Sequence, residues 1–296
     1  MILIGELFAL LTSVCWSISA FAFNHAIDRI NSIQVNTDRI IFAIILLFVT
    51  ISLMGIGYNV SSSQLVFLFF SGAVGLVFGD SFLFKSYQHI GARISMLLMA
   101  LSPVMSAVLA YFFLHETLTS WGLVGMIVTI SGVALVVMER NEIPSSKYKI
   151  SKVGIFYGLM GALGQAGGLV LAKCAFNEGS INGFLATFIR LVSAVIILFP
   201  LVVLARRYKN PIRIYMNDPR ALGANIAGTI LGPYLGITFS LLAVAKAKVG
   251  IASTLMSLMP ILMLPIAKYI FKENINWRAV SGAILAVAGV AILFMR

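Results

Sequence analysis

Charged side chains are scarce in this chain. Asp, Glu, Lys and Arg make up 10% of the 296 residues, whereas hydrophobic residues make up 60%. Soluble domains carry about 25% charged residues, because their surfaces face water. The composition therefore excludes an ordinary soluble fold and indicates that lipid surrounds most of the chain.

Side chains that carry out catalysis or bind metals are also few. The chain has three histidines and two cysteines. HExxH and CxxC motifs are absent, and the glycine-rich stretches lack the strand-and-helix setting of a phosphate-binding loop. We therefore expect no enzyme activity, no metal and no other cofactor. The histidines fall in separate predicted loops and the cysteines in apolar runs, without disulfide or metal spacing: His25, His89, His115, Cys15 and Cys174.

Long apolar runs are what the sequence has in abundance. Runs of about 18 or more residues, at about 1.5 Å per residue, are long enough to cross about 30 Å of hydrocarbon. We expect an all-α integral membrane protein with ten transmembrane helices. The predicted spans are 2–23, 35–54, 65–86, 92–114, 121–138, 153–175, 182–204, 222–243, 250–271 and 277–294.

One apolar segment occurs twice. Residues 98–116, LMALSPVMSAVLAYFFLHE, return 157 positions later as residues 255–273, LMSLMPILMLPIAKYIFKE. Glycines keep the same offset, as Gly79 and Gly236 show. The chain is therefore a duplication, which in a membrane protein is typical of transporters with a site between the two copies.

The duplication divides the chain into three predicted parts. These are a first five-helix repeat at 1–138, a charged linker at 139–152 and a second five-helix repeat at 153–296. Because five is an odd number, the second copy enters the membrane from the opposite side. We therefore expect two inverted repeats.

Basic residues are distributed unequally between the two sides of the predicted membrane. The net charge of +11 lies in short loops and not on one soluble face, so we expect no nucleic-acid partner. Of the Lys and Arg residues, 16 fall on one side and 5 on the side that carries both chain ends. Basic loops are typical of the cytoplasmic side, which places both ends outside the cytoplasm.

Several paired motifs resemble one transporter family. Each repeat has an arginine in its second span, Arg39 in TDRIIF and Arg190 in FIRLVS, and a proline followed thirteen residues later by glutamate. The last helices carry matching glycines in GMIVTISGVAL and GAILAVAGVAI. Over its whole length the chain resembles the drug/metabolite transporter superfamily, in its ten-helix EamA-type branch.

The resemblance implies a secondary transporter, commonly an exporter of amino acids, other metabolites or drugs, with a central cavity walled by both repeats. It also implies that both chain ends lie in the cytoplasm, whereas the charge count places them outside. The sequence leaves this orientation open.

Two large side chains interrupt otherwise small helix faces. Glycines in the sixth span lie on one face, and Gln165 falls in the same stripe, while Trp16 occupies a similar place in the first span. Small residues allow close helix contact in lipid, so a large side chain among them suggests a cavity wall. The alternative is a packed tryptophan and a glutamine bonded between helices.

Asp80 is the only acid well inside a predicted span. A carboxylate there is costly unless it is paired or hydrated, so it is a functional candidate. It could carry a proton or balance the charge of a substrate amine. It could instead form a fixed ion pair with Arg39 or with Lys85.

The two repeat-related arginines lie at different predicted depths. Arg190 is about eight residues into its span, too deep to reach water easily, whereas Arg39 is about four residues in and can reach the interface. Arg190 could bind a carboxylate or tie helix ends to carbonyl groups. Tyr234 lies between two glycines and is a further cavity candidate. The predicted substrate contacts are Trp16, Asp80, Gln165, Arg190 and Tyr234.

The remaining candidates concern shape and structural charge. Pro103 and Pro260 each remove a helical hydrogen bond and predict bends. Gly79 and Gly236 are predicted sites of movement. Glu116 and Glu273 end the fourth and ninth spans, and we expect them to cap or pair across short loops. We assign structural charges to Arg39, Lys85, Glu116 and Glu273.

We interpret the chain as a secondary-active exporter of small metabolites such as amino acids or amphipathic compounds. It would work by alternating access and be driven by protons or exchange. The alternatives are a non-transporting membrane subunit, a passive channel or, less in keeping with its side chains, a membrane enzyme. We expect a multi-pass protein of a bacterial or archaeal inner membrane, with the lipid bilayer and a small-molecule substrate as partners. The oligomeric state stays open.

Overall fold

The computed structural model describes residues 2–138, 151–259, 261–262 and 277–294. In this described part the secondary structure is helical. The helices of the first half are α1 (Ile2–Arg29), α2 (Ser32–Leu53), α3 (Ser62–Gly72), the π-helix η1 (Ala73–Gly79), α4 (Asp80–Met99), α5 (Ser102–Leu114) and α6 (Ser120–Met138). Those of the second half are α7 (Lys152–Asn177), α8 (Gly183–Leu204), α9 (Pro211–Asn217), α10 (Pro219–Thr229), the π-helix η2 (Ile230–Gly236), α11 (Ile237–Lys246), α12 (Val249–Met256) and α14 (Trp277–Phe294).

Six helical segments of the described chain are long and apolar enough to cross a membrane. Shorter apolar helices cover Ser102–Leu114, Ser120–Leu135 and Val280–Ile292. The prediction of an all-helical membrane protein is thus confirmed. The number of ten spans is not, because six segments of the described chain reach this length and part of the ninth predicted span lies outside the described residues. The six segments are Ile4–Arg29, Ser32–Leu53, Ser62–Gly91, Lys152–Asn177, Gly183–Leu204 and Pro219–Lys246.

Polar residues at the helix starts explain where several helices begin. The Asn31, Ser151 and Asn182 side chains each accept a hydrogen bond from a backbone N–H in the first turn of α2, α7 and α8, respectively. At α3, Ser61 and Gln64 form a reciprocal capping box. These contacts satisfy backbone N–H groups that have no partner within the helix.

The predicted fourth span is interrupted. Gly91 has φ 77° and ψ 163°, a left-handed backbone that favours glycine, and it separates the third predicted span from the fourth. The chain then breaks again between α4 and α5. Pro103 is the second residue of α5, where proline fits because its missing N–H would have no helical partner. The break lies directly before Pro103, where the sequence predicts a bend, and Pro260 lies outside the described residues.

A π-helical segment occurs at the same place in both halves. In η1 the N–H of Asp80 donates to the carbonyl of Gly75, and in η2 the N–H of Ile237 donates to that of Gly232. Each bond spans five residues instead of the four of an α-helix. The two segments are separated by the 157 residues of the sequence repeat.

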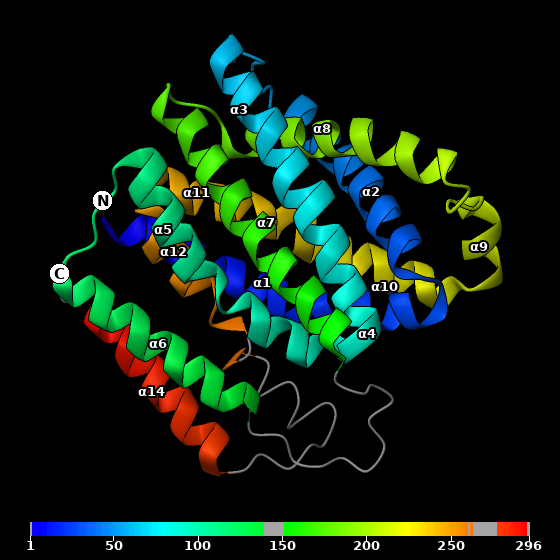
Figure 1. The fold of residues 1–296 in the computed structure, drawn as a ribbon. Coiled ribbons are helices and arrows are strands. Elements are labelled where there is room, and N and C mark those ends of the chain that lie inside the picture. Colours follow the sequence, from blue (N-terminus) through cyan, green and yellow to red (C-terminus); the bar gives the residue numbers. More distant parts are fainter. Residues whose placement is uncertain (1, 139–150, 260, 263–276, 295–296) are drawn as a thin grey trace.

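The last helices of the two halves, α6 and α14, lie side by side at one edge of the bundle (Figure 1). A Cβ added to Gly132 would fall 2.3 Å from the backbone N of Ala286, and one added to Gly289 would fall 2.4 Å from that of Thr129. The two backbones therefore touch through their glycines. Figure 1 also shows both chain ends on one side of the molecule and α9 on the other.

Candidate functional site

A cavity of about 100 Å³ lies between the two halves of the chain. Its wall contains residues of α1, α2, η1, α4 and α5 from the first half, and of α7, α8, η2, α11 and α12 from the second. Four of the five predicted substrate contacts line it, namely Trp16, Asp80, Gln165 and Arg190. The structure therefore brings together residues that are far apart in the sequence.

Tyr234, the fifth predicted contact, is not among the described lining residues. Its hydroxyl lies 2.8 Å from the Oγ1 atom of Thr50 on α2. Its ring lies beside Phe184 of α8, with ring centroids 6.2 Å apart. Tyr234 thus connects η2 to two neighbouring helices.

Arg39 forms an ion pair with Asp80 in the cavity wall. Its Nε atom donates to the Asn36 side chain at 2.9 Å, and its guanidinium lies over the rings of Phe84 and Phe23, at 4.4 and 5.2 Å from their centroids. Arg39 is only 5% exposed, so its side chain is buried within the protein and does not extend to its surface. A carboxylate and two aromatic rings give its charge partners inside the protein.

Lys85 takes no part in this ion pair. Its Nζ atom lies 5.4 Å from the ring centroid of Tyr157 and 6.0 Å from that of Phe82. Of the two partners that the sequence offers for Asp80, the structure selects Arg39.

Glu116 caps a helix of the other half. Its Oε2 atom accepts a hydrogen bond of 2.8 Å from the backbone N–H of Val249, the first residue of α12. Lys248 donates in return to the carbonyl of Thr117, at 2.5 Å. A carboxylate at a helix N-terminus satisfies a free N–H and faces the positive end of the helix dipole. The corresponding Glu273 lies outside the described residues.

Arg190 lies on α8 with 2% of its surface exposed. Its Nε atom has no hydrogen-bond partner in the described part of the chain. The guanidinium fits against two glycines, because a Cβ on Gly75 would lie 2.9 Å from Nη2 and one on Gly168 would lie 3.3 Å away. Glycine at these positions therefore leaves the space that the arginine occupies.

Trp16 and Gln165 face the cavity from the first helices of the two halves. Trp16 lies against η2, where a Cβ on Gly236 would fall 2.5 Å from its Nε1 atom. In the first half, η1 touches α7 so closely that a Cβ on Gly164 would fall 2.4 Å from the Cα of Gly79. The two predicted sites of movement, Gly79 and Gly236, are thus places of close helix contact.

Sequence reasoning missed a second buried carboxylate, Asp38, which is 1% exposed. It accepts hydrogen bonds from the hydroxyls of Tyr208 at 2.7 Å and Tyr215 at 2.8 Å, and from the amide of Gln34 at 3.0 Å. Asn225 donates to the Tyr215 hydroxyl at 2.7 Å. The sequence signal was weak, because Asp38 lies near the start of its span and its tyrosine partners are 170 and 177 residues away.

Burial and then the Asp38 carboxylate raise the pKa of the Tyr208 and Tyr215 hydroxyls. Both groups therefore stay protonated at neutral pH and act as donors. Since Asp38 belongs to α2 and the tyrosines to the segment between α8 and α10, this cluster ties the first half to the second.

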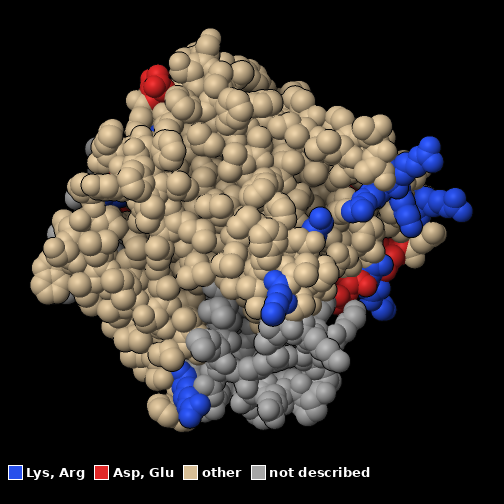
Figure 2. Space-filling model, viewed as in Figure 1, with Lys and Arg blue, Asp and Glu red and all other residues tan. Residues whose placement is uncertain are grey.

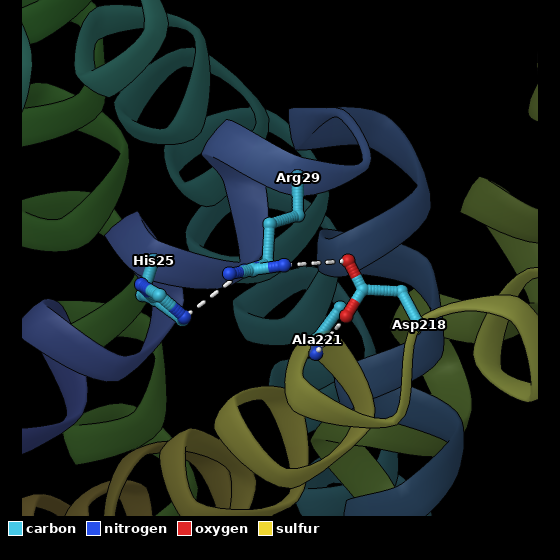
Figure 3. Close-up of polar contacts among 4 residues, drawn as sticks. All are labelled: His25, Arg29, Asp218 and Ala221. Carbon is cyan, nitrogen blue, oxygen red and sulfur yellow. Dashed lines mark hydrogen bonds and ion pairs between the residues drawn. The ribbon is translucent and has the colours of Figure 1, made fainter.

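A second tie lies at the same end of the molecule (Figure 3). Arg29, at the end of α1, pairs with Asp218 at 2.9 Å and donates from Nε to His25 at 3.0 Å. Asp218 also accepts a hydrogen bond from the backbone N–H of Ala221 in the first turn of α10. The Arg29 hydrogen bond, followed by that of Ala221, lowers the pKa of the Asp218 carboxyl.

Basic side chains gather around α9. Figure 2 shows a dense group of Lys and Arg at the edge of the molecule where Figure 1 places this helix. Arg206, Arg207, Lys209 and Arg213 in this segment are all exposed. Part of the excess of basic residues on one side, which the sequence predicts, therefore lies beside the Asp38 cluster and the Arg29–Asp218 pair.

Comparison with known proteins gives a family and a fold. The profile of the EamA-like transporter family matches residues 3–138 and 152–295. No curated protein matches the chain. One crystal structure has 14% sequence identity and a TM-score of 0.77, over 98% of this chain and 96% of the other, and this likeness concerns the fold alone.

Proposed function

The chain belongs to the EamA-like transporter family, and from that premise we propose that it is a secondary-active exporter of small metabolites such as amino acids or amphipathic compounds. The family consists of membrane transporters and not enzymes. The observation that carries the proposal is the cavity, because helices of both halves wall it and three charged residues line it, the buried Arg39 and Arg190 and the partly buried Asp80. Charged residues are costly to bury inside a membrane protein, and a purely structural subunit would not need them.

The proposed mechanism is alternating access between two inverted repeats, 1–138 and 153–296. The repeats rock about the cavity, and the π-helical segments η1 and η2, with Gly79 and Gly236 at their ends, move against α7 and α1. Because the sequence has no nucleotide-binding motif, protons or substrate exchange supply the driving force. Asp80 is the candidate proton carrier, and its release from Arg39 accompanies the change of state.

The multi-pass protein is placed in the cell membrane of a bacterium or archaeon. We assign the basic end around α9 to the cytoplasmic side, since short cytoplasmic loops carry the excess of Lys and Arg. On this assignment, the Asp38 cluster and the Arg29–Asp218 pair close the cytoplasmic end, and both have to separate when the cavity opens there. Trypsin cleavage around Arg206 and Arg207 in inside-out but not right-side-out vesicles would support this orientation.

Counterflow in proteoliposomes tests the function. Vesicles are loaded with a panel of amino acids and other metabolites, and entry of labelled substrate is followed with and without a proton gradient. Saturable counterflow is expected for at least one compound, whereas a passive channel would give flux that does not saturate. A folded protein without flux under any gradient would instead favour a non-transporting subunit. For the folded variant Asp80→Asn, we expect loss of proton-driven flux, and unchanged pH dependence would exclude Asp80 as proton carrier.

A further inference from the structure

The charged residues of the cavity do not balance one another. Among the described lining residues, Arg39, Asp80 and Arg190 carry charge, two positive and one negative. Arg39 and Asp80 neutralise each other in their ion pair. One positive charge, that of Arg190, is left without a paired carboxylate in the described wall.

An arginine so placed is costly to the protein alone. Arg190 is 2% exposed, and its Nε donor is buried without a hydrogen-bond partner among the described residues. A buried donor that stays unsatisfied destabilises the folded protein, and it does so more strongly when it is charged. An anion bound in the cavity would satisfy the donor and balance the charge.

We propose that Arg190 binds a carboxylate of the transported molecule, and that the substrate is a small monoanion with an apolar body. This inference rests on the proposed transport function. Arginine suits the role because its planar guanidinium can bind both oxygens of a carboxylate. Gly75 and Gly168 hold the side chain in place, which reduces the entropy lost on binding.

The rest of the wall indicates the nature of the body. Aromatic rings and thioethers line much of the cavity, including those of Trp16, Phe84, Tyr87, Met99 and Met256. Such surfaces bind apolar and aromatic groups. A monocarboxylate with one aromatic ring or a branched aliphatic chain fits this combination.

A second polar atom strengthens the assignment. The Oγ atom of Ser102, at the start of α5, is buried without a partner in the described part of the chain, and Ser102 also lines the cavity. A hydroxyl can donate to a second carboxylate oxygen or to another polar group of the substrate. Organic cations are disfavoured, because they meet the unbalanced charge of Arg190 and can reach Asp80 only by competing with Arg39.

Trp16 provides a reporter for the test. The chain has three tryptophans, and the other two, Trp121 and Trp277, are 61% and 71% exposed. In the variant Trp121→Phe with Trp277→Phe, fluorescence therefore reports on the cavity. The probes are phenylacetate, phenylacetamide and phenethylamine, which share a ring and are respectively anionic, neutral and cationic at pH 7. Binding to the purified protein in detergent is measured for each.

We expect phenylacetate to bind at least about tenfold more tightly than phenylacetamide, as a charge-assisted hydrogen bond implies, and phenethylamine to bind most weakly. Arg190→Gln should remove the preference for the anion and leave amide binding unchanged, whereas Arg190→Lys should keep part of it. Arg220→Gln, a change of an exposed arginine, is the matched control and should have no effect. Equal binding of anion and amide, or an unchanged preference in Arg190→Gln, would overturn the proposal.

Two further measurements keep the test decisive. If Arg190→Gln does not fold, Gly75→Ala replaces it, because the added methyl group would lie 2.9 Å from Nη2 and displace the guanidinium; an undiminished anion preference in that variant counts against the proposal. Gly223→Ala in α10, where an added Cβ would have no atom within 4 Å, is the control. Carboxylate binding without counterflow of any metabolite would refute transport but not the anion site. Counterflow without a preference for the anion would support transport and refute the anion site.

Discussion

The two π-helical segments have equal length and equivalent hydrogen bonds, but they meet different neighbours. On one side, η1 touches α7 through glycines, Gly79 against Gly164 and Gly75 against Gly168. On the other, η2 meets large aromatic side chains of α1, where Gly236 faces Trp16 and Gly232 faces Phe23. The same π-helical backbone therefore packs against glycine backbone in the first half and against aromatic rings in the second.

Charged residues at equivalent positions also differ between the two halves. Asp80 follows η1, whereas Ile237 occupies the same position after η2. Arg39 finds a carboxylate and two rings within its own half, while its counterpart Arg190 lies buried against glycines with an unpaired Nε. Duplication thus supplied a symmetrical frame, and side-chain divergence concentrated the charge at one place in it.

The largest effect on stability is expected from removing the ion pair between Arg39 and Asp80, which the second half lacks. Arg39→Met alone leaves the Asp80 carboxylate buried without its cation, which should lower the free energy of unfolding by about 3–5 kcal/mol. Adding Asp80→Ile, which copies the second half, should restore most of the stability. The free energies are measured by denaturant unfolding in micelles. A double variant as unstable as the single one would contradict this account of the pair.

A smaller loss of stability should follow when one methyl group is added to either π-helix interface. In Gly164→Ala the new Cβ would meet the backbone of Gly79 at 2.4 Å, so the helices must separate, at about 2–3 kcal/mol. In Gly232→Ala it would meet the Phe23 ring at 2.9 Å, and a side chain can turn away. Thermal unfolding of the two variants compares the interfaces directly, and equal losses would show that the ring interface is as rigid as the glycine one.

Tyr215 and Tyr234 of the second half both make hydrogen bonds to α2 and provide a finer comparison. Tyr215→Phe removes a donor to the Asp38 carboxylate and should cost about 1.5–3 kcal/mol, as expected for a bond to a charged group. Tyr234→Phe removes only a bond to the Thr50 hydroxyl and should cost about 0.5–1.5 kcal/mol. The same unfolding assay ranks them, and a reversed order would mean that the Asp38 cluster contributes little to joining the halves.

The smallest effect is expected at the exposed Arg29–Asp218 pair. Asp218→Asn removes the charge but can keep the cap on α10, whereas Asp218→Ala removes both, so alanine should lower the melting temperature more. The pKa of Asp218 is depressed from its ordinary value of 3.8. The stabilisation is therefore present above that value and is lost as the pH falls through the folded pKa. Melting temperatures of wild type and Asp218→Asn should converge at acid pH, and a constant difference would point to another cause.

Sequence patterns predicted the helical membrane fold because each apolar run reports its own contact with lipid. The EamA family was likewise predicted from paired motifs and is confirmed. Four predicted contacts line one cavity because glycine stripes and buried charges mark inward faces, although their role in binding stays a prediction. The Asp38 cluster and the interior position of Arg39 could not be predicted, since both depend on side chains that only the tertiary fold brings together.

The matching positions of η1 and η2 also date an event in the history of the chain. A π-helical turn arises when one extra residue is inserted into an α-helix, and such turns are rare. Two independent insertions at equivalent places are a poor explanation for segments separated by the same 157 residues as the sequence repeat. One insertion in a single ancestral unit, copied when that unit doubled, accounts for both. The wide turn is therefore older than the cavity that now lies between the copies.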